Sequence, residues 1–256
     1  MRWRSHCVQT SLLSGDATQT VDSGCLTTPI PPLPVNHVER FTTRRTGRCA
    51  VRGPADPATA RELWIVLHGY GQLAREFIDG VSAADDGTRL IVAPEALSRF
   101  YSSQAPLAHF SSAADPVGAS WMTRDDREDE IVDQIFWLGQ VLETYRARVA
   151  PNTPVTVLGF SQGAAAAVRW VDSGGVTPAH LIVWGALPDA SLPTNSVVWT
   201  TRCTLVVGNR DQFLPEAKVE AERARLDQAG VPYTFVSFVG GHRLDDTTLS
   251  RLIATA

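Results

Sequence analysis

The pentapeptide at residues 159–163, Gly-Phe-Ser-Gln-Gly, limits most strongly what this chain can fold into. A β-branched, apolar run (155–158) precedes it, and an alanine-rich stretch of helical character begins at Ala164. A Gly-x-Ser-x-Gly sequence between a strand and a helix is typical of a sharp turn that exposes the serine hydroxyl. Its glycines stand where side chains would crowd the backbone. The pattern predicts that Ser161 is a nucleophile; the alternative is a structural serine in a small-residue loop.

Two further segments supply the partners that such a nucleophile needs. A serine hydroxyl is weakly nucleophilic until a base removes its proton. The apolar run 205–207 leads to Asp211, a carboxylate just past a predicted strand, and the alternating run 233–239 leads through two glycines to His242. Serine, then acid, then histidine is one of the orders in which catalytic-triad residues follow one another along a chain. Ser161, Asp211 and His242 are therefore the candidate catalytic residues.

Other acids and histidines fit these roles less well. Asp189, Asp245 and Asp246 are alternative acids, but Asp211 alone directly follows a predicted strand between the serine and the histidine. None of the other histidines ends a strand after the acid: His6 and His37 lie in the N-terminal segment, His68 in another motif, His109 in a loop, and His180 at the start of a strand.

Backbone amides are the expected donors to the oxyanion that forms on a substrate carbonyl. One is the N–H of Gln162, the residue after the nucleophile, at the positive end of the following helix. The apolar run 63–67 leads into His68-Gly69-Tyr70-Gly71, which nominates the N–H of Tyr70 as the second donor. His68 is interpreted as a loop-packing residue, because a triad needs only one histidine.

Strand and helix patterns alternate along most of the chain. Alternation of this kind predicts a mostly parallel sheet with helices on both faces and a site at the carboxyl ends of the strands. A β-hairpin is expected over 38–52 and a long loop over 95–120. The predicted strands are 63–67, 89–93, 155–158, 181–185, 205–207 and 233–239, and the predicted helical segments are 73–84, 123–149, 164–170, 215–228 and 246–254.

Two apolar residues are candidates for the wall of a substrate pocket. Trp121 follows the long, aromatic-containing loop, and loops of this length are often functional. Two interpretations of Trp121 stay open: it lines the substrate pocket, or it packs on the core beneath the loop. A tryptophan is a large hydrophobic residue, and either environment can bury it. Leu214, shortly after Asp211, is the other candidate.

Composition excludes several other classes of function. The 256 residues suffice for one α/β domain, and the net charge of −4, with scattered Lys and Arg, gives no basic face for nucleic acid. The four cysteines have no zinc-ligand spacing, so no metal site is expected. No run approaches a transmembrane length, which argues against stable membrane insertion.

The first 36 residues differ in character from the rest. They are rich in Ser, Thr and Pro and are expected to form a flexible leader, followed by a single catalytic domain over 37–256. Residues 5–22 contain no apolar core long enough for a secretory signal, so a cytoplasmic location is expected. The sequence gives no indication of oligomeric state.

The motifs together resemble the phospholipase/carboxylesterase family of α/β-hydrolases, which includes acyl-protein thioesterases. The resemblance covers roughly residues 37–256 and rests on four segments: the pentapeptide 159–163, Leu-His-Gly-Tyr-Gly at 67–71, Gly-Gly-His at 240–242 and Ser-Trp-Met at 120–122. It implies an α/β-hydrolase fold without a separate cap domain and a shallow acyl site that needs no cofactor. Thioesterases typically continue the tryptophan with Phe-Asp, whereas this chain has Met122-Thr123. It is therefore more similar to the bacterial carboxylesterase branch.

These observations predict a serine carboxylesterase that hydrolyses small or short-chain esters through an acyl-enzyme. One alternative is an acyl-protein thioesterase or lysophospholipase. Another is a non-catalytic ligand-binding protein on a hydrolase scaffold, although an intact triad argues against it. A peptidase is a weaker possibility because no cap or propeller domain restricts the site to peptides.

Overall fold

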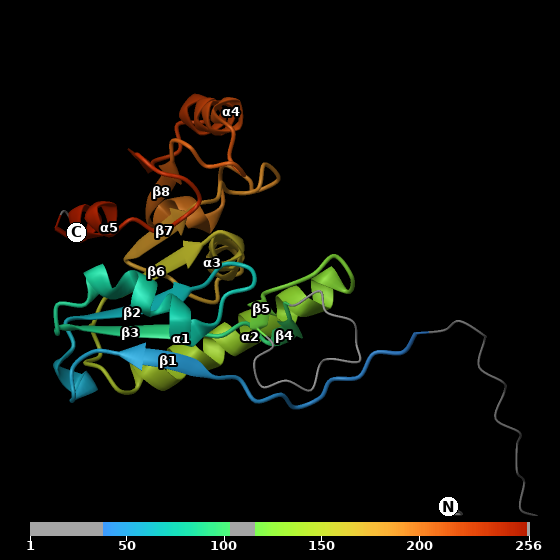
Figure 1. Cartoon of the computed structure of the whole chain (residues 1–256), viewed down its shortest axis with the longest axis vertical. Coiled ribbons are helices and arrows are strands. Elements are labelled where there is room, and N and C mark those ends of the chain that lie inside the picture. Colours follow the sequence, from blue (N-terminus) through green and yellow to red (C-terminus); the bar gives the residue numbers. More distant parts are fainter. Residues whose placement is uncertain (1–37, 103–115, 255–256) are drawn as a thin grey trace, which may run out of the picture. The chain divides into compact units, whose positions relative to one another are not determined.

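The strand before Ser161 lies in the middle of the main sheet. The computed structural model describes residues 38–102 and 116–254, and the helices and strands of these residues all lie in one compact unit that begins at Arg44. The main sheet has seven strands (Figure 1). In spatial order they are β1 (Cys49–Arg52), β3 (Arg89–Pro94), β2 (Glu62–Leu67), β6 (Val155–Phe160), β7 (His180–Trp184), β8 (Arg202–Gly208) and β9 (Thr234–Phe238).

Helices cover both faces of this sheet. The strands are parallel except β1, and β6 is buried along its whole length, as expected for a parallel strand covered on both sides. On one face pack α2 (Arg127–Arg146), α3 (Gln162–Asp172) and α4 (Glu216–Gln228); on the other pack α1 (Ala74–Phe77), the 3₁₀ segment η2 (Asp79–Ala84) and α5 (Asp246–Ala254).

Successive side chains of a strand point to opposite faces of the sheet. Leu63 and Ile65 of β2 contact the α3 side, while Trp64 and Val66 contact the α1 side. Shorter elements complete the described chain: the 3₁₀ segments η1 (Pro57–Thr59) and η4 (Val197–Thr200), and a small sheet of β4 (Ser98–Tyr101) with β5 (Val117–Ser120). In the described ranges, no helix has both the length and the apolarity to cross a membrane.

The predicted parallel sheet with helices on both faces is confirmed, but two local expectations are wrong. No hairpin forms over 38–52: only 49–52 is a strand, and it pairs antiparallel with β3, a partner far along the chain. The expected irregular loop over 95–120 instead contains β4 and β5, which pair with each other. Residues 1–37, and with them the expected leader, lie outside the described residues, as do 103–115.

A buried histidine at the start of β7 makes stability depend on pH. His180 is only 5% exposed, and its Nε2 lies 2.8 Å from Thr204 Oγ1. Burial, with a smaller contribution from the Arg202 charge, lowers the pKa of His180 from 6.5 to about 4. As pH falls, the unfolded chain therefore takes up this proton first. The contribution of neutral, buried His180 to the free energy of unfolding is therefore fully present above pH 6.5, and it is lost as the pH falls from 6.5 toward 4.

We therefore expect the free energy of unfolding to fall by about 2 kcal/mol between pH 7 and pH 4.5 through His180 alone. Urea unfolding at the two pH values measures it. Because other groups titrate in the same range, the control is His180→Gln, whose stability should fall by correspondingly less. Equal losses in the parent and the variant would show that His180 is not responsible.

Candidate active site

Ser161 occupies a strained turn between β6 and α3. Its φ of +56° and ψ of −119° lie outside the regions that non-glycine residues usually adopt. Strain of this kind persists only where the surroundings hold it, and the Ser161 N–H donates to Trp184 O at 2.8 Å. The sharp turn predicted from the pentapeptide is thus confirmed.

The two glycines of the pentapeptide allow the close packing that this turn needs. A Cβ atom at Gly163 would collide with the backbone oxygens of Leu67 and His68, at the end of β2. One at Gly159 would collide with the backbone of Gly163 and Ala164. The first turn of α3 therefore lies directly against both β6 and the end of β2, which brings Ser161 beside the loop that follows β2.

Ser161, His242 and Asp211 form one hydrogen-bonded chain. Ser161 Oγ lies 2.8 Å from His242 Nε2, and His242 Nδ1 lies 2.7 Å from Asp211 Oδ2. The Asp211 side chain is 1% exposed and that of His242 is 13% exposed. A carboxylate can only accept, so Nδ1 carries the proton and Nε2 is free to accept the serine hydroxyl proton. The structure brings these three sequence-nominated residues together in the orientation that proton transfer requires.

Backbone hydrogen bonds hold the loops of the acid and the histidine against each other. The N–H of Asn209 donates to Phe238 O at 2.9 Å, and the N–H of Arg210 donates to Gly240 O at 2.8 Å. The second carboxylate oxygen of Asp211 accepts the Phe213 N–H at 2.9 Å. Both orientation and burial of this carboxylate are thus fixed before any substrate arrives.

Two phenylalanines that the sequence analysis did not single out enclose the imidazole. Phe160 lies 4.9 Å from the His242 ring, and Phe213 packs edge-on against it with centroids 4.8 Å apart. Phe213 is 63% exposed, so it also presents an apolar surface to solvent beside the site. Its position two residues after Asp211, at the end of a parallel strand, is a signal that could have identified it.

The topology places the loop after β2 next to the turn at Ser161. From β2 the chain passes to β3 on one side, and later returns to β6 on the other side of β2. In open α/β sheets, ligands bind where the strand order reverses in this way, at the carboxyl ends. In the loop 68–72, the N–H of Gly69 donates to Gln72 Oε1 at 2.8 Å and that of Gly71 to Ala119 O at 2.9 Å.

Within the described residues, the N–H groups of Tyr70 and Gln162 are not used in internal hydrogen bonds. These are the two donors nominated from the sequence. Because Gly163 packs closely against the end of β2, the start of α3 and the loop after β2 lie side by side, and each carries one of these two N–H groups. Gln162 is also the first residue of α3, where the helix dipole favours negative charge. The arrangement can therefore offer two amides to an oxyanion near Ser161.

His68 is fully buried and packs the loop, as interpreted from the sequence. Its Nε2 accepts the Ala96 N–H at 3.0 Å, so its Nδ1–H donates to Gly69 O at 2.8 Å. Burial lowers the pKa of His68, which favours the neutral ring that this pattern needs. The imidazole thus links the loop after β2 to the segment after β3.

Trp121 is 3% exposed and also forms hydrogen bonds with the loop after β2 and with Gln162. Its Nε1–H donates to His68 O at 2.8 Å, and its backbone N–H donates to Gln162 Oε1 at 3.0 Å. The Gln162 side chain continues this link by donating to Met122 O at 2.8 Å. Leu214, the other residue nominated for a pocket wall, is 8% exposed and packs with Val207 and Val219. The assignment of either residue to a substrate pocket stays a prediction.

Two of the three alternative acids, Asp245 and Asp189, have other hydrogen-bond partners. Asp245 accepts the Thr248 N–H at the start of α5, Asp189 accepts the Ser191 N–H, and Asp246 lies in the first turn of α5. His6, His37 and His109 lie outside the described residues.

Comparisons with known proteins identify the fold. No protein-family model and no curated protein sequence matches the chain. Solved structures do match over 82% of the chain: acyl-protein thioesterase 2 from Zea mays (TM-score 0.59, 17% identity, 97% of that chain) and a carboxylesterase from Mesorhizobium loti (TM-score 0.58, 16% identity, 94% of that chain). A third is the Bacillus cereus carboxylesterase (TM-score 0.58, 12% identity, 92% of that chain, 82% of this one). Together with its mostly parallel, helix-covered sheet, these similarities show that the chain has the α/β-hydrolase fold of solved carboxylesterases and acyl-protein thioesterases.

Proposed function

We propose that this protein is a serine carboxylesterase that hydrolyses small or short-chain carboxylic esters. The observation that carries the proposal is the hydrogen-bonded chain from Ser161 through His242 to Asp211, built on a strained strand-to-helix turn. Nucleophile, base and orienting acid in this geometry are the recurring constellation for acyl transfer. The proposal assigns the activity to residues 37–256 as a single catalytic domain without a separate cap, located in the cytoplasm.

In the first half of the proposed reaction, Ser161 Oγ attacks the ester carbonyl while His242 Nε2 accepts the hydroxyl proton. Asp211 holds the imidazole in the required tautomer and stabilises its charged form. The N–H groups of Gln162 and Tyr70 stabilise the oxyanion. The C–O bond of the alcohol then breaks, and His242 returns the proton to the departing oxygen. In the second half, water attacks the acyl-enzyme by the same steps and releases the acid.

The surroundings of Ser161 suit an apolar substrate in an open site. Tyr70 is 62% exposed and stacks on Phe100 with ring centroids 5.1 Å apart, and the exposed Phe213 packs edge-on against His242. Aromatic rings exposed beside a nucleophile offer apolar area to the acyl or alcohol group. This favours carboxylic esters over strongly hydrated substrates.

Hydrolysis of p-nitrophenyl esters from acetate to palmitate tests the proposal. We expect kcat/KM to peak at short acyl chains, which is the substrate class that we propose. A maximum at long chains would instead favour the acyl-protein thioesterase or lysophospholipase alternative. Comparison of matched thioesters with oxygen esters then separates those two.

Labelling with a fluorophosphonate probe distinguishes an enzyme from a non-catalytic binding protein. Such probes react with a serine that an adjacent base activates, so we expect covalent modification of Ser161, identified by peptide mass spectrometry. A folded protein that neither reacts nor hydrolyses any ester of the series would refute the proposed function.

A further inference from the structure

The last residue of β7 contacts both the turn of the nucleophile and the loop of the histidine. Trp184 lies in the middle of the main sheet, between β6 and β8, and it is fully buried. Its carbonyl oxygen accepts the Ser161 N–H at 2.8 Å. Its indole Nε1–H donates to the carbonyl oxygen of Arg243, the residue after His242, at 2.9 Å. A single residue therefore joins the segments that carry the proposed nucleophile and the proposed base.

The two sides of the histidine loop are held by different parts of the molecule. On the N-terminal side, Gly240 O accepts the Arg210 N–H at 2.8 Å, and the Gly240 N–H donates to Asn209 Oδ1 at 3.2 Å. These hydrogen bonds join the histidine loop to the loop of the acid. On the C-terminal side, no hydrogen bond among the described residues other than that of Trp184 joins the backbone of 242–244 to β6 or β7. This hydrogen bond therefore fixes the base relative to the nucleophile.

The remaining contacts near the imidazole do not replace this link. The Arg243 guanidinium pairs with Asp245 at 3.0 Å, within the same segment, and lies over the ring of Phe238 in β9. Phe213, which packs against the imidazole, belongs to the loop of Asp211 and is mostly exposed. None of these contacts joins the histidine loop to the strand that ends before Ser161.

The position of the imidazole relative to β7 decides the length of the hydrogen bond between serine and histidine. His242 Nε2 lies 2.8 Å from Ser161 Oγ. Gly185, the residue after Trp184, packs so closely that an added Cβ atom would lie 3.2 Å from His242 Cε1. A misplacement of about 1 Å in a catalytic site can cost about 100-fold in rate. A shift of the histidine loop away from β7 would therefore slow the transfer of the serine proton to His242.

We propose that Trp184 is a positioning residue for the reaction: its indole N–H holds the C-terminal side of the histidine loop, so that His242 stays within hydrogen-bonding distance of Ser161. Trp184 is buried and acts on the base only through the chain, so it is not a catalytic residue. Its ring packs with that of Phe238, with centroids 5.8 Å apart, as an apolar core residue does. This assignment rests on the proposed esterase function.

The first test is Trp184→Phe, which removes the indole N–H and keeps an aromatic ring in the core. We expect kcat for p-nitrophenyl butyrate to fall about tenfold, the effect of losing about one hydrogen bond. KM should stay almost unchanged, because both halves of the reaction use His242 and Trp184 does not touch the substrate. Labelling of Ser161 by a fluorophosphonate should slow by a similar factor. A purely structural role would lower stability and leave both rates of the folded protein unchanged.

A second replacement separates the loss of the N–H from the change in ring size. 3-Benzothienylalanine, incorporated at position 184 by codon suppression, has the bicyclic shape of tryptophan but carries sulfur in place of the N–H. We expect it to disturb the packing less than Trp184→Phe does, and to lower kcat by the same factor of about ten. A kcat equal to that of the parent would overturn the proposal, whatever the result for Trp184→Phe.

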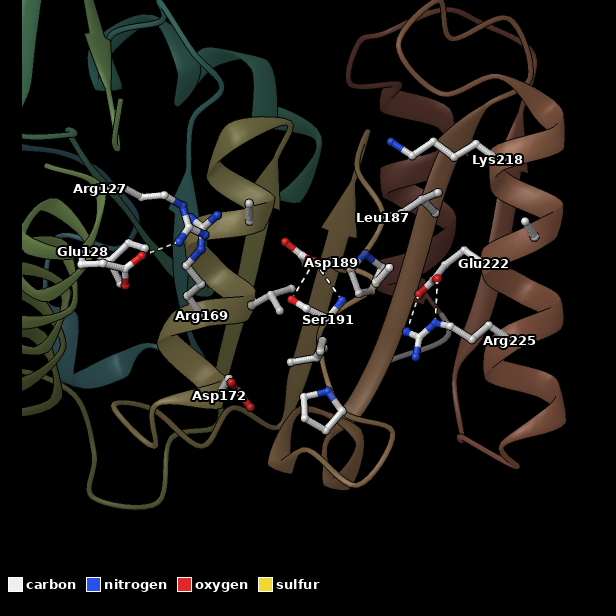
Figure 2. Close-up of a pocket in the computed structure, with 18 residues that line it drawn as sticks. Arg127, Glu128, Arg169, Asp172, Leu187, Asp189, Ser191, Lys218, Glu222 and Arg225 are labelled. Carbon is white, nitrogen blue, oxygen red and sulfur yellow. Dashed lines mark hydrogen bonds and ion pairs between the residues drawn. The ribbon is translucent and has the colours of Figure 1, made fainter. Parts of the chain in front are cut away.

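A matched control is Trp199→Phe. Trp199 is 5% exposed, and its Nε1–H also donates to a carbonyl oxygen, that of Pro193, at 3.1 Å. Pro193 ends the segment 187–193, which lines a groove of about 820 Å³ between α3 and α4 (Figure 2). None of the three proposed catalytic residues lines that groove. Trp199→Phe should therefore lower thermal stability and leave kcat unchanged. An equal loss of kcat in both variants would refute a specific role for Trp184.

Hydrogen exchange separates this inference from the esterase function itself. In full-length Trp184→Phe, amides of the peptide 239–245 should exchange with deuterium about tenfold faster than in the parent, measured by mass spectrometry, whereas Trp199→Phe should not change them. If the parent hydrolyses no ester yet shows this difference, the esterase function fails and Trp184 still holds the histidine loop. If the parent is an esterase and Trp184→Phe changes neither the exchange nor kcat, the esterase function stands and the positioning role is refuted.

Discussion

Replacing Ser161 by alanine should lower kcat for p-nitrophenyl butyrate by about ten-thousandfold or more, because no other group can form the acyl-enzyme. His242 and Asp211 would remain in place but would have no hydroxyl to activate. Turnover is followed by p-nitrophenolate absorbance, with single-turnover measurements to exclude a burst from contaminating enzyme.

The same variant should remain folded. Alanine and serine have similar preferences at the positive φ of this turn, and the packing of Gly159 and Gly163 is untouched. We expect the free energy of unfolding to change by less than about 1 kcal/mol, measured in urea. A folded variant with substantial remaining turnover would show that Ser161 is not the nucleophile.

Replacing Asp211 by asparagine should lower kcat by about ten-thousandfold while leaving the geometry of the site almost unchanged. The Asp211 Oδ2 atom now accepts the proton of His242 Nδ1. An amide nitrogen in its place would donate to Nδ1 and leave the proton on Nε2, which could no longer accept from Ser161. The same ester assay measures the loss.

A matched control for Asp211→Asn is Asp245→Asn, because Asp245 was the alternative acid nearest to His242 in the sequence. Asp245 accepts from the N–H and the hydroxyl of Thr248 at the start of α5, at 3.0 and 2.8 Å. Asparagine caps a helix about as well as aspartate, so Asp245→Asn should change the free energy of unfolding by less than about 1 kcal/mol and leave kcat almost unchanged. The reverse pattern, with Asp245→Asn inactive and Asp211→Asn active, would contradict the assignment of the acid.

The parts of the site that depend on local chain geometry could be predicted from the sequence. The turn at Ser161 follows from a strand, two closely spaced glycines and a helix, all within a short segment. The meeting of Asp211 and His242 could be inferred because parallel strands β8 and β9 end at the same edge of the sheet. The alternating strand and helix patterns predict that both strands are parallel members of one sheet, although Asp211 and His242 are far apart in the sequence.

Features that depend on contacts between distant segments could not be predicted. The segment 38–52 resembles a hairpin locally, yet its strand pairs with β3 across a long sequence separation. The charge of Arg169 on a helix suggests a solvated residue, and only the packing of α2, α3 and α4 places it in a groove beside Arg127. The burial of Trp121 under the loop 68–72 likewise depends on tertiary packing.

The hydrogen bonds of His68 have a consequence for how pH-dependent rates should be interpreted. Because this ring accepts the Ala96 N–H, it must remain neutral for the loop bearing Tyr70 to keep its conformation. Burial lowers its pKa and thereby delays protonation as the solution becomes acidic. Protonation of His68 should therefore contribute little to the acidic limb of a pH–rate profile, and the loop that bears the Tyr70 amide should keep its conformation as the solution becomes acidic.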